Sequence, residues 1–351
     1  MYETRESVLK LGDQHPEFSQ FLLTAKDVPN IPLSALAAAF KQNPPPAPPS
    51  TNIEYTKKIP MRDGYESELR VHQPPGQSPG VRAMFVMIHG GGFCLGNSYT
   101  HSYQSRAIAS LHNLTVVNLS YRLAPEHRFP TGPDDVWDSL QWLSQADNAK
   151  ELGCDLSLGF YIGGVSAGGN LSAVTAQRWV SENRTPKLSG VWACIPYLLE
   201  TEIVPAEYKH LYLARKQNAN AMVINQEAME FVGEAYRPDV LSPSFSPFQA
   251  DHPHEGMPPV YIQVAGQDPL RDDGLIYEKA LRAHGVSTRL DVYPGLPHAF
   301  DGIFRELNIS KKCMSDMLAG VGWLTGKEVN SKLCEEAVEE SYAATPSVRP
   351  I

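Results

Sequence analysis

The sequence predicts an α/β fold in which a mostly parallel β-sheet is covered by helices on both faces. Two observations support this prediction. From residue 81 onward, short apolar runs alternate with amphipathic helical patterns, and strands that take turns with helices pair in parallel. The composition, with 42% hydrophobic and 20% charged residues, is that of a globular chain able to bury a large core.

The first part of the chain is expected to be helical and to end at a proline-rich stretch. Several apolar residues are spaced for one helical face: Leu22, Leu23, Leu33, Leu36 and Phe40. The run PPPAPP at 44–49 stops any helix, so we expect a boundary there. Residues 53–61 and 67–75 then alternate around the turn-like RDGYE, which predicts an antiparallel pair of strands opening the sheet.

Strands and helices then alternate as far as residue 324. Strands are expected within 81–90, 115–121, 158–165, 188–197, 258–266 and 290–295. Helices are expected near 100–111 and 134–143, from Ala167, and over 272–285 and 309–324. Residues 198–250 interrupt this rhythm and predict an insertion over the edge of the sheet. Residues after 330 are expected to be less ordered.

Composition also excludes several classes of function. The formal net charge is -9 and the chain has no Lys/Arg cluster, which argues against nucleic-acid binding. No apolar stretch approaches the roughly 18 residues of a membrane span, and the N-terminus lacks the apolar core of a secretory signal. The five cysteines have no metal-ligand spacing, so we expect free thiols, no metal, and a reducing, cytoplasmic location.

The segment GVSAG, from Gly164 to Gly168, is the strongest local signal for chemistry. It follows a predicted strand and precedes a predicted helix, which is the context of a nucleophile elbow that exposes the hydroxyl of Ser166. The flanking glycines allow chain segments to pass where a Cβ would clash. The alternative interpretation is that these small residues only permit a tight turn between strand and helix.

A second motif, His89-Gly90-Gly91-Gly92, directly follows the predicted strand AMFVMI. Flexible backbone N–H groups at the end of a strand can bind the oxyanion that forms when a serine attacks an ester. We assign the N–H groups of Gly91, Gly92 and Ala167 as its donors. A phosphate-binding loop is the alternative, but it needs a lysine or a G-x-G-x-x-G pattern, and neither occurs here.

The acid and the base should follow the serine along the chain. Asp268 lies just past the strand predicted at 258–266, at the sheet edge expected for Ser166. Asp272 and Asp273 are rivals, but they are expected in the first turn of a helix, where carboxylates complement the helix dipole.

Two histidines follow Asp268 in the chain. His284 precedes Gly285 in the last turn of that predicted helix, which indicates a capping role. His298, in the loop GLPHAF after the last strand, can take a proton from a serine near neutral pH.

With these residues in place, the chain resembles the hormone-sensitive-lipase family of α/β-hydrolases over about residues 81–325. It shows HGGGFCLG, GVSAGGN, DPLRDDG and HAF in the order typical of that family, and YRLAPE with its following helix between the first two. One departure is Val165, where many members have aspartate. This difference leaves the triad intact but puts in doubt how the elbow is buttressed.

The resemblance implies an α/β-hydrolase fold with a helical cap made from residues 1–50 and about 198–250. A catalytic domain would then span 51–330, followed by a tail at 331–351. The family's triad matches Ser166, Asp268 and His298, and its oxyanion hole matches Gly91, Gly92 and Ala167. These are the same six residues that the local patterns indicate.

The expected activity is hydrolysis of a small carboxylic ester with a short to medium acyl chain, through an acyl-enzyme and without a cofactor. The same site could instead serve a formamide or another amide, or transfer the acyl group to an alcohol. A receptor without catalysis is a third alternative. The sequence leaves the oligomeric state open, although pairing of edge strands would allow a homodimer.

Overall fold

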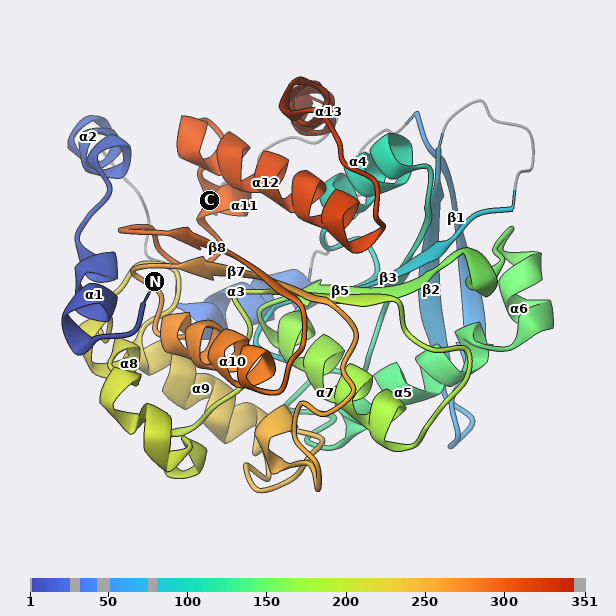
Figure 1. Ribbon diagram of the computed structural model, residues 1–351, viewed down its shortest axis with the longest axis horizontal. Helices are drawn as coiled ribbons and strands as arrows, with labels where there is room; N and C mark the ends of the chain where they lie inside the picture. Colours follow the sequence, from blue (N-terminus) through green and yellow to red (C-terminus); the bar gives the residue numbers. More distant parts are fainter. Residues whose placement is uncertain (1, 26–31, 43–50, 75–80, 344–351) are drawn as a thin grey trace.

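The computed structural model describes residues 2–25, 32–42, 51–74 and 81–343. Eight strands form one sheet in the order β1-β2-β4-β3-β5-β6-β7-β8 (Figure 1). The strands are β1 Ile53–Pro60, β2 Glu66–Gln73, β3 Met84–Ile88, β4 Thr115–Leu119, β5 Phe160–Val165, β6 Gly190–Cys194, β7 Val260–Ala265 and β8 Thr288–Tyr293. Strand β2 pairs antiparallel with β1 and β4, and all other pairs are parallel. The predicted α/β-hydrolase fold with a mostly parallel sheet is confirmed.

Helices cover both faces of the sheet (Figure 1). One face carries α4 Ser102–His112, α11 Phe300–Ile303, α12 Asn308–Leu324 and α13 Ser331–Ala343. The other carries α5 Thr131–Leu143, α7 Ala167–Ser181 and α10 Arg271–Ala283, with α6 Ala146–Glu151 beyond α5. Because the central parallel strands β3 to β7 face helices on both sides, most of their side chains are apolar whichever way they point.

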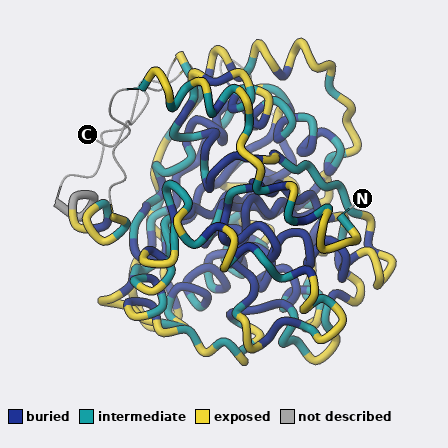
Figure 2. The backbone as a smooth tube through the Cα atoms, turned by 90° about the vertical axis from the view of Figure 1, so that its left-hand side faces the viewer, coloured by how far each residue is buried: buried dark blue, intermediate teal, exposed yellow. Residues whose placement is uncertain are grey.

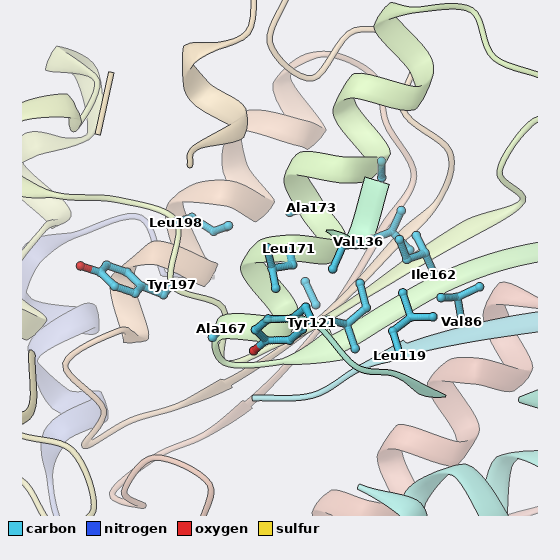
Figure 3. Packing of buried hydrophobic residues seen from close by; sticks show 14 of the residues in the cluster. Val86, Leu119, Tyr121, Val136, Ile162, Ala167, Leu171, Ala173, Tyr197 and Leu198 are labelled. Atoms are coloured by element: carbon cyan, nitrogen blue, oxygen red, sulfur yellow. The ribbon is translucent and has the colours of Figure 1, made fainter. Parts of the chain in front are cut away.

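The core lies above and below the central strands, which are buried throughout (Figure 2). Along β3, Val86 packs into the cluster under α5 and α7, whereas Phe85 packs into the cluster on the opposite face. Figure 3 shows Leu171 of α7 near the side chains of the central strands, just past the start of that helix. The turn between β5 and α7 therefore rests on a close-packed layer that resists displacement.

Residues 198–250, between β6 and β7, form short helices rather than sheet. They comprise η3 Thr201–Ile203, η4 Ala206–Leu211, α8 Ala214–Gln217, α9 Gln226–Tyr236 and η5 Pro247–Gln249. Helix α9 contacts α3 Leu33–Gln42 from the N-terminal part of the chain. These elements lie at the end of the molecule where β7 and β8 finish (Figure 1).

Two predictions about the chain ends are wrong. The N-terminal residues do not share one apolar face, because separate helices α1 Arg5–Leu9, α2 Pro16–Thr24 and α3 replace it, and Leu23 is 82% exposed. Residues 331–343 are not less ordered but form α13, which packs on α4 and α12 through Cys334 and Val338. Its sequence is mostly polar, so two buried positions gave little periodic signal. The predicted boundary at PPPAPP lies outside the described residues.

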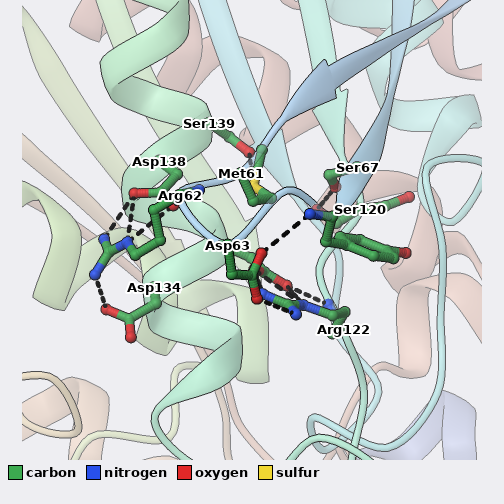
Figure 4. Close-up of polar contacts among 11 residues, drawn as sticks. Met61, Arg62, Asp63, Ser67, Ser120, Arg122, Asp134, Asp138 and Ser139 are labelled. Atoms are coloured by element: carbon green, nitrogen blue, oxygen red, sulfur yellow. Dashed lines mark hydrogen bonds and ion pairs between the residues drawn. The ribbon is translucent and has the colours of Figure 1, made fainter.

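A buried ion pair ties the end of β4 to α5 (Figure 4). The guanidinium of Arg122 lies 2.7 Å from the fully buried carboxylate of Asp135 and also bonds Asp63, and the bonds to Asp135 raise the pKa of Arg122. By contrast, Arg62 pairs with Asp134 and Asp138 while its side chain stays 46% exposed.

We predict that Arg122→Met costs about 3 kcal/mol of unfolding free energy, because it leaves a buried carboxylate without its cation. The matched variant Arg62→Met should cost less than about 1 kcal/mol, because its pair is largely solvated. Urea unfolding of the two variants measures this difference. Equal losses would contradict the assignment of Arg122 as a structural ion-pair partner.

All five cysteines lie in the described part of the chain, are buried, and form no disulfide. Among the described helices, none is both long and apolar enough to cross a bilayer.

Candidate active site

Ser166 is the single residue between β5 and α7, and its backbone adopts φ 58° and ψ -117°. This is a sparsely populated region for a residue with a side chain, so the surrounding structure must hold it there. The N–H of Ser166 donates to the carbonyl of Cys194 at 2.8 Å. A Cβ at Gly164 or Gly168 would overlap the backbone of β3, so only glycine lets the turn approach that strand.

His298 and Asp268 meet Ser166 from two further strand ends. Imidazole Nε2 of His298 lies 2.9 Å from Oγ of Ser166, and Nδ1 lies 2.7 Å from Oδ2 of Asp268. Asp268 is fully buried, and its Oδ1 accepts the N–H of Leu270 at 2.8 Å. With Nδ1–H donated to the carboxylate, the lone pair of Nε2 faces the serine hydroxyl. The arrangement can move a proton from Oγ to the imidazole.

The rival carboxylates, Asp272 and Asp273, lie in the first turn of α10 as predicted, and both point away from His298. Oδ2 of Asp272 accepts the N–H of Ala214 at 2.6 Å. Oδ2 of Asp273 accepts the N–H groups of Leu198 and Leu199 at 2.9 and 3.0 Å. These carboxylates therefore anchor the insertion between β6 and β7.

His284 is at the C-terminal end of α10. Its Nδ1 lies 2.8 Å from the carbonyl of Ala280. The predicted capping role is confirmed.

The His89-Gly90-Gly91-Gly92 loop presses against the serine turn. A Cβ at Gly90 would lie 3.3 Å from Cβ of Ser166 and 2.7 Å from the carbonyl oxygen of Val165. Gly91 and Gly92 have φ 116° and 58°, which glycine adopts without strain. Within the described part of the chain, no acceptor pairs with the N–H of Gly91, Gly92 or Ala167. These amides are available to an anion beside Ser166.

Two residues that the sequence analysis did not single out hold this loop. The N–H of Gly90 donates to Nε2 of His101 at 3.3 Å. The hydroxyl of Tyr121 donates to the carbonyl of His89 at 3.0 Å. The rings of Tyr121 and His89 also stack, with their centroids 4.2 Å apart. Tyr121 begins the YRLAPE segment, whereas His101 stands before α4 in a stretch without a recognisable motif.

The orientation of the Gly91 amide follows from His89. Nδ1 of His89 lies 2.8 Å from the carbonyl of Gly90. In a trans peptide the C=O and the following N–H point in opposite directions, so this bond directs the Gly91 N–H away from His89. Burial lowers the pKa of His89 to about 4 and that of His101 to about 3. Both rings are therefore neutral at neutral pH and keep their hydrogen-bonding roles.

These buried histidines also predict an acid-sensitive fold. Burial lowers the pKa of His72, and it lowers the pKa of four others: His89, His112 and His254 to about 4, and His101 to about 3. Since their unfolded pKa is about 6.5, the unfolded chain binds more protons as the pH falls. Burial raises the pKa of Asp273 to about 7 and also raises that of Asp301, which offsets at most two of the four.

We therefore expect the unfolding free energy to be highest above about pH 6.5 and to fall by about 2 to 3 kcal/mol per pH unit between about pH 6 and 4.5. Urea unfolding at several pH values measures this slope. His254→Gln should reduce the number of protons taken up on unfolding by about one and so lower the slope. His252→Gln should leave the slope unchanged, because the His252 side chain is 77% exposed. A stability that stays flat over this range would contradict the prediction.

Helices α3 and α9 lie directly over the glycine loop. A Cβ at Gly92 would lie 2.8 Å from Cγ2 of Val232 in α9 and 3.3 Å from Cδ2 of Leu33 in α3. Phe93 stacks on Tyr236 of α9, with ring centroids 4.0 Å apart. Apolar side chains of α3 and α9 therefore lie against Gly92.

In the described ranges, no three His, Cys, Asp or Glu side chains gather in a way that could hold a metal ion.

Comparison with known proteins agrees with the fold. Residues 85–302 match a family described as having the α/β-hydrolase fold. The chain is 35% identical over 266 residues to an AB hydrolase superfamily protein of Schizosaccharomyces pombe, covering 76% of this chain and 78% of that protein. It is 32% identical over 294 residues to versiconal hemiacetal acetate esterase of Dothistroma septosporum, covering 83% and 86%. It is 34% identical over 268 residues to carboxylesterase NlhH of Mycobacterium tuberculosis, covering 74% and 78%.

Two solved structures show the same architecture. Vibralactone cyclase superposes with a TM-score of 0.80 at 30% identity, over 90% of this chain and 96% of that one. An esterase of Pyrobaculum calidifontis superposes with a TM-score of 0.72 at 28% identity, over 89% and 98%.

Proposed function

Since this chain belongs to the hormone-sensitive-lipase family of α/β-hydrolases and is a carboxylic ester hydrolase, we propose that Ser166, His298 and Asp268 are its catalytic triad. The observation that carries this proposal is the unbroken hydrogen-bonded chain from Asp268 through His298 to Ser166, at 2.7 and 2.9 Å. Among the described acidic residues, only Asp268 takes part in this series of hydrogen bonds.

In the proposed mechanism, His298 takes the proton of the Ser166 hydroxyl as Oγ attacks the ester carbonyl. The N–H groups of Gly91, Gly92 and Ala167 stabilise the tetrahedral oxyanion, and each such donor typically contributes about 3 kcal/mol to the transition state. His298 then protonates the departing alcohol. Water attacks the acyl-enzyme by the same sequence, and Asp268 holds the imidazole in the required tautomer throughout.

We further propose that α3 and the insertion at 198–250 form a cap that restricts the acyl group to short chains. The support is the apolar cover that Leu33 and Val232 place against Gly92. The name of the 32% identical Dothistroma septosporum relative specifies an acetate ester, which is the shortest common acyl group of this kind.

Rates on p-nitrophenyl esters from acetyl to decanoyl test the acyl preference. We expect kcat/KM to be highest from acetyl to butyryl and to fall at least about tenfold by decanoyl, because one methylene is worth about 1–3 kcal/mol in a matched pocket. Val232→Ala should move the optimum toward longer chains. An optimum at octanoyl or longer in the unmodified protein would contradict the proposed restriction.

A second candidate is transfer of the acyl group to a hydroxyl within the same substrate. The 30% identical structure is a vibralactone cyclase, and a lactone is a cyclic ester. Closing such a ring on this site would need a substrate hydroxyl in place of water at the acyl-enzyme step. Mass spectrometry of the products from an ω-hydroxy ester separates the two reactions, since hydrolysis gives the hydroxy acid and transfer gives the lactone.

A further inference from the structure

The loops that carry Asp268 and His298 are joined to each other. The N–H of Gly266 donates to the carbonyl of Tyr293 at 2.8 Å, and the N–H of Gln267 donates to the carbonyl of Leu296 at 2.9 Å. These bonds continue the pairing of β7 with β8 past the ends of the strands. A shift of one loop would therefore carry the other with it.

A third segment, residues 11–15, runs from the last two residues of η1 Lys10–Gly12 to the start of α2 and contacts both loops. The N–H of Gly295 donates to the carbonyl of Leu11 at 2.8 Å, and the N–H of His15 donates to the carbonyl of Gly295 at 3.2 Å. Nε2 of Gln267 donates to the carbonyl of Gly12 at 3.0 Å. Figure 1 shows this stretch, between α1 and α2, beside the ends of β7 and β8.

The fit between these backbones leaves no room for a side chain. A Cβ at Gly295, where φ is 71°, would overlap the carbonyl oxygen of Asp13 and the nitrogen of His15. A Cβ at Gly266 would overlap the carbonyl oxygen of Leu11. Gly266 precedes Asp268 by two residues, and Gly295 precedes His298 by three. The backbone position of each glycine therefore constrains the position from which that side chain projects.

The insertion also holds the acid loop. Nδ2 of Asn218, in the insertion, donates to the carbonyls of Gly266 and Asp268 at 3.2 and 2.9 Å. The segment from Gly266 to Asp268 is therefore in contact with both the insertion and the N-terminal residues.

We propose that residues 11–15 form an N-terminal brace that positions Asp268 and His298 for catalysis. The inference rests on the proposed triad. Its physical basis is that a displacement of about 1 Å in a catalytic group can cost about 100-fold in rate, and the brace fixes the backbone from which the imidazole and the carboxylate project. The brace residues touch neither substrate nor reacting atoms, so they are positioning residues.

The first test compares Gly295→Ala with Gly285→Ala. Both positions have positive φ, 71° and 75°, but a Cβ at Gly285 would meet no heavy atom within 4 Å. The pair therefore separates contact with the brace from backbone strain. We expect Gly295→Ala to lower kcat for p-nitrophenyl acetate about 100-fold with KM nearly unchanged, and Gly285→Ala to change kcat less than about twofold.

A second pair of variants, with smaller expected effects on folding, tests the proposal if Gly295→Ala fails to fold. Gln267→Met removes one bond to the brace, whereas Gln73→Met removes a similar bond, to the carbonyl of Leu152 at 2.9 Å, far from the site. We expect Gln267→Met to lower kcat about fivefold at unchanged KM, because one hydrogen bond is lost. Gln73→Met should shift the melting temperature by a similar amount and leave kcat unchanged.

The proposed role of the brace is wrong if Gln267→Met, and Gly295→Ala where it folds, have the same kcat as their controls. It is also wrong if kcat falls only in proportion to the melting temperature. Ser166→Ala measured alongside keeps the two proposals apart. An inactive Ser166→Ala with a fully active Gly295→Ala rejects the brace alone, whereas an active Ser166→Ala rejects the triad itself.

Discussion

Ser166→Ala should lower kcat for p-nitrophenyl acetate by about 10⁵-fold or more. The hydroxyl is the only group that Nε2 of His298 faces in the described structure, at 2.9 Å. Removing it ends acyl-enzyme formation and leaves only the weak catalysis due to the oxyanion donors and binding. The fold should survive, because the turn is held by the backbone bond from Ser166 to Cys194 and by the glycines around it.

Ser172→Ala is the matched control for this experiment. Ser172 lies in α7, the helix that follows Ser166, and is fully buried, and its hydroxyl donates to the carbonyl of Gly168 at 2.7 Å. We expect this variant to lose about 1 kcal/mol of stability and to keep its kcat. Circular dichroism melting and initial rates are measured on both variants. A Ser166→Ala protein that turns over at even a few per cent of the original rate would remove the serine from the mechanism.

The sequence allowed prediction of the parts of the fold that depend on local pattern. Buried parallel strands are mostly apolar runs, so each strand from β3 to β7 was expected near its observed position. The site followed from topology, because the carboxyl ends of parallel strands meet at one edge. Ser166 after β5, Asp268 after β7 and His298 after β8 are therefore brought together although far apart in the chain.

The parts that could not be predicted depend on contacts between distant backbones. The contacts of Gly295 with residues 11–15 join backbone amides and carbonyls, which nearly every residue carries. Residue type thus gives no signal for them. Helix α13 escaped prediction for a related reason, since its place on α4 and α12 is set by tertiary packing of a mostly polar segment.

Asp268→Asn should lower kcat about 10⁴-fold while leaving the fold intact. The carboxylate now accepts Nδ1–H of His298 at 2.7 Å through Oδ2 and the N–H of Leu270 at 2.8 Å through Oδ1. Asparagine can keep its oxygen on the Leu270 N–H only by turning its NH₂ group toward His298. The imidazole then places its lone pair on Nδ1 and its proton on Nε2, where it can no longer accept the proton of Ser166.

Asp273→Asn distinguishes this role from that of the neighbouring carboxylate. Asp273 is equally buried, but it binds the N–H groups of Leu198 and Leu199 and the guanidinium of Arg215, 3.2 Å away. Its replacement should cost about 2 kcal/mol or more of unfolding free energy and change kcat by much less than Asp268→Asn. For both variants, kcat and the free energy of unfolding in urea are measured. If Asp273→Asn gave the larger loss of kcat at equal stability, the acid would have to be reassigned, because a residue that only anchors the insertion cannot control the tautomer of His298.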